Sequence, residues 1–119
     1  MKPIQQILKL STKEYYMKHL SIVSCLLPTH LTDKEIEVLS LFLYYSGELT
    51  MNDMFNSLSR KRVREILNIS QGGLGNYLKS MLDKKVLTRN IYNKLEIRPY
   101  LLPNSESQGY QIMIKRIKG

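Results

Sequence analysis

The stretch LNISQGGLGNYLKSMLDKKVLTR, from Leu67 to Arg89, decides the fold, because a polar turn in it leads into an amphipathic helix. Behind the turn NIS, apolar residues recur at the spacing i, i+3, i+4, i+7 and i+8, namely at Leu74, Tyr77, Leu78, Met81 and Leu82. This spacing predicts a helix of about three turns with one buried face. The opposite face is expected to be exposed and to carry Gln71, Gly72, Gly75, Asn76, Lys79, Ser80 and Asp83.

Glycines are concentrated at the start of this helix, at Gly72, Gly73 and Gly75. Each one lowers helix stability by up to about 1 kcal/mol relative to alanine, so a compensating role is expected. Two explanations stay open: the helix backbone comes very close to a phosphate or a groove wall, or it packs flat against another protein. A third interpretation is that Gly72 and Gly73 belong to the turn and that the helix begins near Leu74.

Capping patterns predict two helices upstream. The motif STKE at 11–14 is a capping box and opens a helix that would end before Pro28. The motif TDKE at 32–35 opens a second helix, which Gly47 would end by supplying a left-handed residue. The segment 3–10 is weakly helical.

Two short helical pieces follow in the middle of the chain. MNDMFNSL (51–58) is expected to start at Asn52, and SRKRVREILN (59–68) is expected to be capped by Ser59. In the second piece Val63, Ile66 and Leu67 would face inward. The surface would then carry a run of cations, Arg60, Lys61, Arg62 and Arg64.

The period changes after Lys85. VLTRNIYNKLEIRPYLLP (86–103) is rich in β-branched and aromatic residues, and YQIMIKRI (110–117) alternates apolar with polar or longer side chains. Both patterns are typical of strands, and PNSESQG (103–109) between them is typical of a turn. The carboxyl-terminal third is therefore predicted to form a β-hairpin with a broad loop.

A helix, the turn NIS, a second helix and the segment KKVLTR (84–89) leading into a hairpin resemble the winged helix-turn-helix DNA-binding family, of the bacterial or phage regulator type. The resemblance covers residues 31–117, and Lys85 stands where a glycine is common in the family. It implies an α+β fold, mostly α, in which residues 1–30 are an N-terminal helical extension available for dimerisation. Residues 31–119 would form the winged-helix domain, with the C-terminal β-hairpin as its wing.

The resemblance also implies a DNA-binding surface. The helix over 71–80 would enter the major groove, the cationic helix before it would lie near phosphates, and the hairpin would reach a minor groove. Within the recognition helix, only Gln71 and Asn76 have side chains suited to reading base edges near its start. The candidate DNA-binding residues are Arg60, Lys61, Arg62, Arg64, Ser70, Gln71, Gly72, Asn76, Lys79, Ser80, Arg89, Lys94 and Arg98, with Lys115 and Arg116 also framing the wing.

The composition agrees with a polyanionic partner. The 119 residues suffice for one domain with a real core, and 18 Lys and Arg against 10 Asp and Glu give a formal net charge of +8. Charge that only serves solubility is the alternative. With one cysteine the chain forms no internal disulfide, and no uncharged run is long enough to cross a bilayer, so a cytoplasmic protein is expected.

Enzyme chemistry finds little support in the residues. Cys25 has His19 and His30 nearby in the sequence, but the helical spacing and Pro28 are expected to place them on different faces. Cys25 is instead expected to be a buried thiol. The glycines of GGLG lack the spacing and the lysine of a phosphate-binding loop, and too few Cys and His are present for a metal site. We expect no catalysis, no cofactor and no small-molecule substrate.

These patterns favour a non-enzymatic protein that binds double-stranded DNA, as a homo-oligomeric regulator of transcription or replication. The alternative is a winged-helix module for protein–protein contacts, as a structural component of a phage particle or another nucleoprotein assembly, which would place it in the virion. The apolar residues Leu95, Ile97, Tyr100, Leu101 and Leu102 bear on this choice. They either cover the helical core or form an exposed contact patch.

Overall fold

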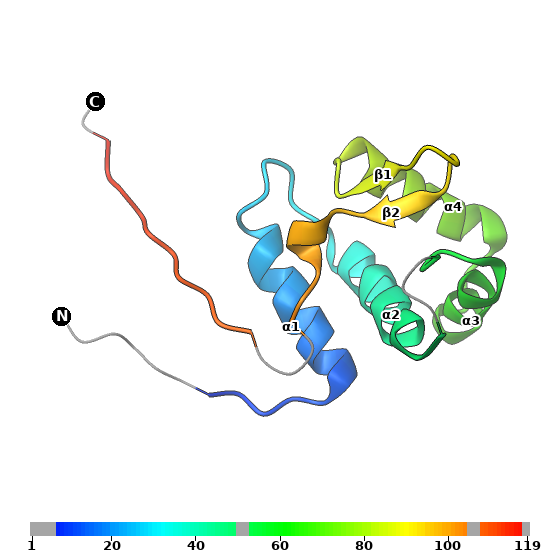
Figure 1. The fold of residues 1–119 in the computed structure, drawn as a ribbon, viewed down its shortest axis with the longest axis horizontal. Helices are drawn as coiled ribbons and strands as arrows, with labels where there is room; N and C mark the ends of the chain where they lie inside the picture. Colours follow the sequence, from blue (N-terminus) through cyan, green and yellow to red (C-terminus); the bar gives the residue numbers. More distant parts are fainter. Residues whose placement is uncertain (1–6, 50–52, 105–107, 118–119) are drawn as a thin grey trace.

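The computed structural model describes residues 7–49, 53–104 and 108–117. The described residues form an α+β fold that is mostly α, with four helices followed by a two-stranded antiparallel hairpin and one 3-10 turn (Figure 1). This layout is consistent with a winged helix. The elements are α1 (Thr12–Ser24), α2 (Asp33–Leu49), α3 (Ser57–Leu67), α4 (Gln71–Asp83), β1 (Leu87–Arg89), β2 (Leu95–Ile97) and η1 (Pro99–Leu101).

Both predicted capping boxes are confirmed. Ser11 is the N-cap of α1, and its hydroxyl accepts a hydrogen bond from the Glu14 backbone N–H at 3.3 Å. At the start of α2, Thr32 and Glu35 bond reciprocally: the Thr32 N–H donates to Glu35 Oε1 at 2.8 Å, and the Glu35 N–H donates to Thr32 Oγ1 at 3.1 Å. Such caps satisfy amide groups that the first helical turn leaves without a partner.

Other predicted helix boundaries are wrong. Gly47 does not end α2, which continues to Leu49. The cap of α3 is Asn56, whose side chain accepts from the Ser59 N–H at 2.8 Å, so Ser59 lies inside the helix and is buried. Ile66, expected to face inward, is exposed.

The helices predicted over residues 3–10 and from Asn52 onward are not observed in the described residues. Residues 7–10 and 53–56 are not helical, while 3–6 and Asn52 lie outside the described residues. The described part of the chain therefore has four helices, where the sequence predicted about five.

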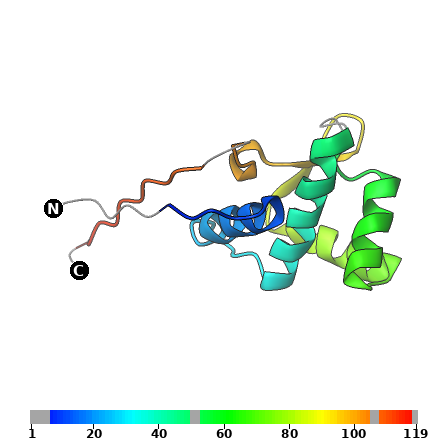
Figure 2. The same ribbon diagram turned by 90° about the horizontal axis from the view of Figure 1, so that it is seen from below.

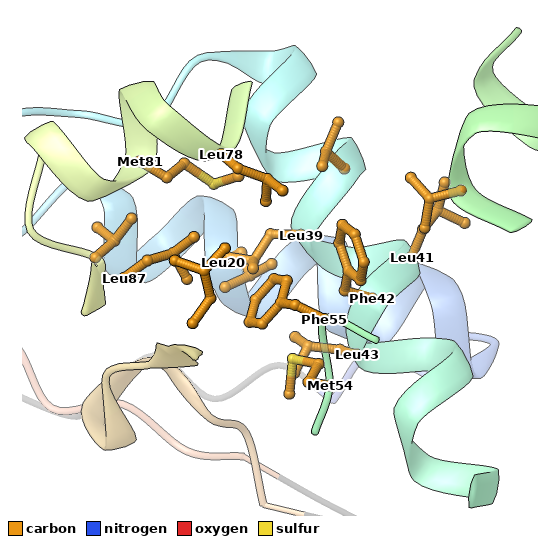
Figure 3. Close-up of a cluster of buried hydrophobic side chains, with 14 of the residues drawn as sticks. Leu20, Leu39, Leu41, Phe42, Leu43, Met54, Phe55, Leu78, Met81 and Leu87 are labelled. Atoms are coloured by element: carbon orange, nitrogen blue, oxygen red, sulfur yellow. The ribbon is translucent and has the colours of Figure 1, made fainter. Parts of the chain in front are cut away.

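The core is built around α2. Its residues 38–43 are all buried, because α1, α3 and α4 all pack against this helix. A helix buried on most of its circumference is expected to be apolar on most sides. Figure 3 shows Phe42 of α2 beside Phe55, with ring centroids 4.7 Å apart, and Leu20 of α1 in the same cluster. The N-terminal helix α1 thus shares its core with the helices that follow.

The hairpin is shorter than predicted and lies earlier in the chain. β1 pairs with β2 in the register Leu87↔Ile97, Thr88↔Glu96 and Arg89↔Leu95. The turn between them is closed by Asn90, whose side chain accepts from the Tyr92 and Lys94 N–H groups, and by Asn93, which has a φ of 60°. Asparagine suits both tasks, because its side chain bonds backbone groups in turns and it tolerates a left-handed conformation. The two asparagines are a turn signal that apolar periodicity does not contain.

The segment 110–117, predicted to be the second strand of the hairpin, is not a strand. The chain leaves β2 through Arg98 and η1, and then lies along α1. There Tyr15 Oη donates to the Asn104 carbonyl at 2.6 Å. His19 Nε2–H donates to the Leu101 carbonyl at 2.9 Å, which leaves Nδ1 to accept from Tyr110 Oη at 2.6 Å. These bonds attach the carboxyl-terminal part of the chain to α1.

His19 makes stability depend on pH. Burial lowers the pKa of His19 below its ordinary 6.5, and the hydrogen bond to the Leu101 carbonyl offsets only part of that. The unfolded chain therefore binds the proton more tightly, so this contribution is complete above pH 6.5 and is lost as pH falls toward the folded-state pKa. We expect the midpoint of urea unfolding to decrease between pH 7 and pH 5.5.

The control for this expectation is His19→Gln, which keeps hydrogen-bonding groups but does not titrate. Its stability should change less than that of the natural chain over the same pH interval. Equal pH dependence in the two proteins would show that His19 is not the group responsible.

Candidate nucleic-acid interface

α4 begins where its N-cap places it. Ser70 is the cap, and its hydroxyl accepts from the Gly73 N–H at 3.0 Å. Gln71, Gly72 and Gly73 therefore form the first turn of the helix, and the interpretation that the helix begins near Leu74 is wrong. A Cβ atom at Gly73 would lie 3.2 Å from Ser70 Oγ. Glycine at this position leaves room for the capping hydroxyl.

The two faces of α4 agree with the periodicity. Leu74, Leu78 and Met81 are buried, and Tyr77 and Leu82 are partly buried against the core. The opposite side is exposed at Gln71, Gly72, Gly75, Asn76 and Lys79. One side of the helix is thus anchored in the protein while the other is free to meet a partner.

The exposed glycines have no packing role in the described part of the chain. A Cβ atom at Gly75 would meet no heavy atom within 4 Å, and one at Gly72 would meet only Ser70 Oγ at 4.0 Å. Larger residues would therefore fit at both positions in this molecule. Because glycine has no side chain, the backbone of α4 is accessible to a partner at these two positions.

Two arginines of α3 lie beside this helix. Arg60 and Arg64 line a groove of about 190 Å³ between α3 and α4, together with Ser57, Gln71, Leu74, Gly75 and Leu78. Arg60 Nε donates to the Phe55 carbonyl at 2.7 Å, which holds its guanidinium at the groove. Arg64 Nε is buried and has no hydrogen-bond partner among the described residues.

The remaining cations of α3 point elsewhere. Arg62 is exposed on the side of α3 that faces α2, and its guanidinium lies over the Tyr45 ring at 5.5 Å from the centroid. Lys61 is exposed and lines a shallow site with Arg64, Glu65, Asn68 and Ile69 at the end of the helix. The structure therefore separates Arg62 from the other predicted phosphate contacts.

The predicted DNA-binding cations of the hairpin each contact another group of the protein. Lys94 Nζ lies 3.6 Å from Asp53 Oδ2, Arg89 Nη1 donates to the Asn93 carbonyl at 3.1 Å, and Arg98 Nε donates to the Lys85 carbonyl at 3.0 Å. Lys94 also lines a second groove, of about 510 Å³, between residues 53–58 and the hairpin. This groove shares Ser57 and Arg60 with the groove along α4.

Ser80 faces the protein and not the exposed side of α4. It is half-buried and lies against the Glu35 carboxylate. Lys115 and Arg116 are exposed on the carboxyl-terminal segment, away from the hairpin that they were predicted to frame. Of the apolar residues after β1, Leu95 and Leu101 are buried, Ile97 is partly buried, and Tyr100 and Leu102 are exposed, so this stretch mainly covers the core.

The groups considered for other chemistry are engaged or exposed. His19 uses both ring nitrogens in hydrogen bonds. Cys25, expected to be buried, is exposed as the C-cap residue that follows α1, where its Sγ lies 3.4 Å from the Ser21 carbonyl oxygen. Within the described residues, no three His, Cys, Asp or Glu side chains are grouped as a metal site would require.

Comparisons with known proteins give no assignment. No protein-family model, curated protein or solved structure matches the chain. None of the helices in the described ranges combines the length and the apolar character that crossing a membrane requires.

Proposed function

We propose that the chain binds double-stranded DNA through the α4 face, defined as the exposed side of α4 (Gln71, Gly72, Gly75, Asn76 and Lys79) with Arg60 and Arg64 of α3. The observation that carries the proposal is the two-sided character of α4. Its apolar side is fixed in the core, and its exposed side lies next to two arginines that share a groove with it.

The side chains of the α4 face suit close approach better than extensive base reading. Arg60, Arg64 and Lys79 are the cations available for phosphates, where each contact gains free energy through counterion release. Gln71 and Asn76 are the two amide side chains able to bond base edges. Gly72 and Gly75 remove the bulk that would hold the helix away from the DNA. Affinity should thus depend strongly on salt and only modestly on sequence.

In the cell, the chain would act as a non-enzymatic regulator of transcription or replication in the cytoplasm. The order of helix, turn, helix and hairpin supports a winged helix-turn-helix, in which α3 and α4 form the helix pair and β1 and β2 the wing. Gly is common in that family where this chain has Lys85, and Lys85 has a φ of 63°. A left-handed residue is what glycine most readily supplies.

A titration of duplex DNA by fluorescence anisotropy at several salt concentrations tests the proposal. The double variant Arg60→Ala, Arg64→Ala should bind more weakly, and the slope of log affinity against log salt should become shallower by about 2, close to one for each lost phosphate contact. The matched control is Arg62→Ala with Lys18→Ala, which removes the same charge from the far side of α3 and from the exposed surface of α1.

The control variant should keep the slope of the natural chain. An equal loss in both double variants would mean that net charge alone drives binding, and no binding of the natural chain to any duplex would overturn the proposal. Circular dichroism of each variant establishes that the helices are intact.

The second candidate function is a protein–protein module within a phage particle or another nucleoprotein assembly. Gly72 and Gly75 favour this function, because a helix of another protein can pack closely against a helix side that carries no side chains. In that case the chain would form defined complexes with protein partners, and DNA affinity would be absent at low salt as well as at high salt.

A further inference from the structure

The carboxyl-terminal segment 110–117 is an extended chain whose backbone has no neighbouring strand in the described structure. Its backbone N–H and C=O groups make no hydrogen bond to described residues. Its large apolar side chains are exposed, above all Met113, Ile114 and Ile117. Figures 1 and 2 show this segment extending away from the helices, at the end of the molecule opposite α3 and α4. Exposed apolar side chains on an unpaired extended backbone are a template for strand pairing.

The segment is held at its base. Tyr110 Oη donates to His19 Nδ1, and Tyr15 Oη donates to the Asn104 carbonyl a few residues earlier. The extended residues beyond Tyr110 therefore start from a fixed point on α1. Pairing therefore loses less conformational entropy, because contacts within the monomer already hold the first residue of the segment in place.

The side chains alternate as in a strand. Tyr110, Ile112 and Ile114 fall on one side of an extended chain, and Gln111, Met113 and Lys115 fall on the other. Isoleucine and tyrosine favour extended pairing. The segment thus has the side-chain pattern of a β-strand, but the monomer provides no neighbouring strand.

We propose that this segment pairs with the same segment of a second copy of the chain, as an antiparallel ribbon centred on Ile112. In this register Ile112 faces the partner's Ile112, and Tyr110 faces the partner's Ile114. On the side that carries Tyr110, Ile112 and Ile114, each side chain thus faces an apolar or aromatic side chain of the partner. The proposal goes beyond DNA binding and places the homo-oligomer contact at the carboxyl-terminal segment, where the sequence had suggested residues 1–30.

Charge favours a second copy in this orientation. Lys115 would face the partner's Gly109, and Arg116 would face the partner's Gln108, so no cation faces another. A parallel ribbon in register would instead set Lys115 against the partner's Lys115, and like charges directly opposite are destabilising. The segment is therefore complementary to itself in the antiparallel orientation.

The same end of the molecule supplies apolar surface to cover the ribbon. An isolated two-stranded ribbon is marginal in water and needs packing on one face. Ile7, Leu8 and Leu10 are exposed just before α1. The chain before α1, drawn in dark blue, leads toward the same end of the molecule as the carboxyl-terminal segment (Figure 2). Because α3 and α4 lie at the far end, the pairing would leave the α4 face of both copies open to DNA.

Sedimentation velocity of the full chain tests the proposal. The natural chain should be a dimer, and Ile112→Lys should be a monomer at the same concentration, because it sets two ammonium groups against each other at the centre of the ribbon. The matched control is Ile91→Lys at the hairpin turn, since Ile91 is also an exposed isoleucine outside the helices and the substitution adds the same charge. The control should stay dimeric. A monomeric natural chain, or a dimer that survives Ile112→Lys, would overturn the proposal.

Disulfide trapping tests the register. In a Cys25→Ser background, Ile112→Cys should form a covalent dimer on mild oxidation, because directly opposed residues bring Cα atoms within disulfide range. Ile117→Cys should form much less, since the two copies of that position lie at opposite ends of the ribbon. Faster trapping through position 117 would contradict the register. DNA titrations of the same samples separate failure of this proposal from failure of the proposed function. A natural chain that is monomeric but binds duplex DNA would contradict only the ribbon, and a dimeric chain without DNA affinity would contradict only the proposed function.

Discussion

Replacement of Lys84 by alanine is expected to lower the free energy of unfolding by about 3–5 kcal/mol. Lys84 Nζ forms an ion pair with Glu35 Oε1, and the Glu35 side chain is 2% exposed. The pair joins the first turn of α2 to the end of α4, residues far apart in the sequence. Without the ammonium group, a buried carboxylate would remain with no opposite charge, which is far more costly than losing an exposed pair.

Urea unfolding at pH 7 measures this effect, and Lys79→Ala is the matched control on the same helix. Lys79 is exposed and makes no ion pair with a described residue, so its replacement should cost well under 1 kcal/mol. A similar loss in the two variants would show that the Glu35–Lys84 pair has no special weight.

The pH dependence gives a second readout of the same pair. Burial by itself raises the pKa of Glu35, but hydrogen bonds with Lys84, the Thr32 N–H and Ser80 together lower it below its ordinary 4.5. In the natural chain this contribution is complete above pH 4.5 and is lost as pH falls through the folded-state pKa. In Lys84→Ala the raising effect of burial should dominate. The stability difference between the two proteins should therefore shrink as the pH is lowered.

The substitution Gly75→Glu is expected to weaken DNA binding at least about a hundredfold. It sets a carboxylate on the α4 face, where the proposal places phosphates, and such like-charge contacts cost several kcal/mol. Each 1.4 kcal/mol or so is a factor of about ten in affinity. Folding should not suffer, because a side chain at Gly75 meets no atom within 4 Å and glutamate is the better helix former.

Anisotropy titrations and thermal unfolding of the same samples measure binding and stability together. Ser21→Glu on the exposed surface of α1 is the control for the change in net charge, and it should cost far less affinity. Gly75→Ala tests close approach without charge: it should raise stability by about 0.5–1 kcal/mol and still weaken binding. If Gly75→Glu leaves affinity unchanged, the α4 face is not the DNA surface.

Features set by neighbours in the chain could be predicted from the sequence. The caps at Ser11 and Thr32 and the buried side of α4 all follow from residues within one or two helical turns of each other. The cap of α3 could also have been found, because Asn56 precedes the helix with the same chemistry. Ser59 has the same capping chemistry three residues later, and only the tertiary structure shows that Ser59 is buried inside the helix.

The candidate site was only partly predictable. The sequence grouped Arg60, Arg62 and Arg64 in one cationic run, and the structure sends Arg62 to Tyr45 while the other two line the groove along α4. Residues two apart on a helix point in directions about 200° apart, so the separation follows from helical geometry. Which of the two directions meets α4 depends on how the helices pack.

The sequence by itself determined the capping boxes that open α1 and α2, the turn NIS and the two-sided character of α4, since hydrogen bonds and periodicity within single elements specify these. Only the tertiary structure decided where the hairpin closes, that segment 110–117 is not part of it, and that Glu35 meets Lys84 and His19 meets Tyr110. These contacts join residues distant in the chain, and burial makes them favourable only after the helices have packed.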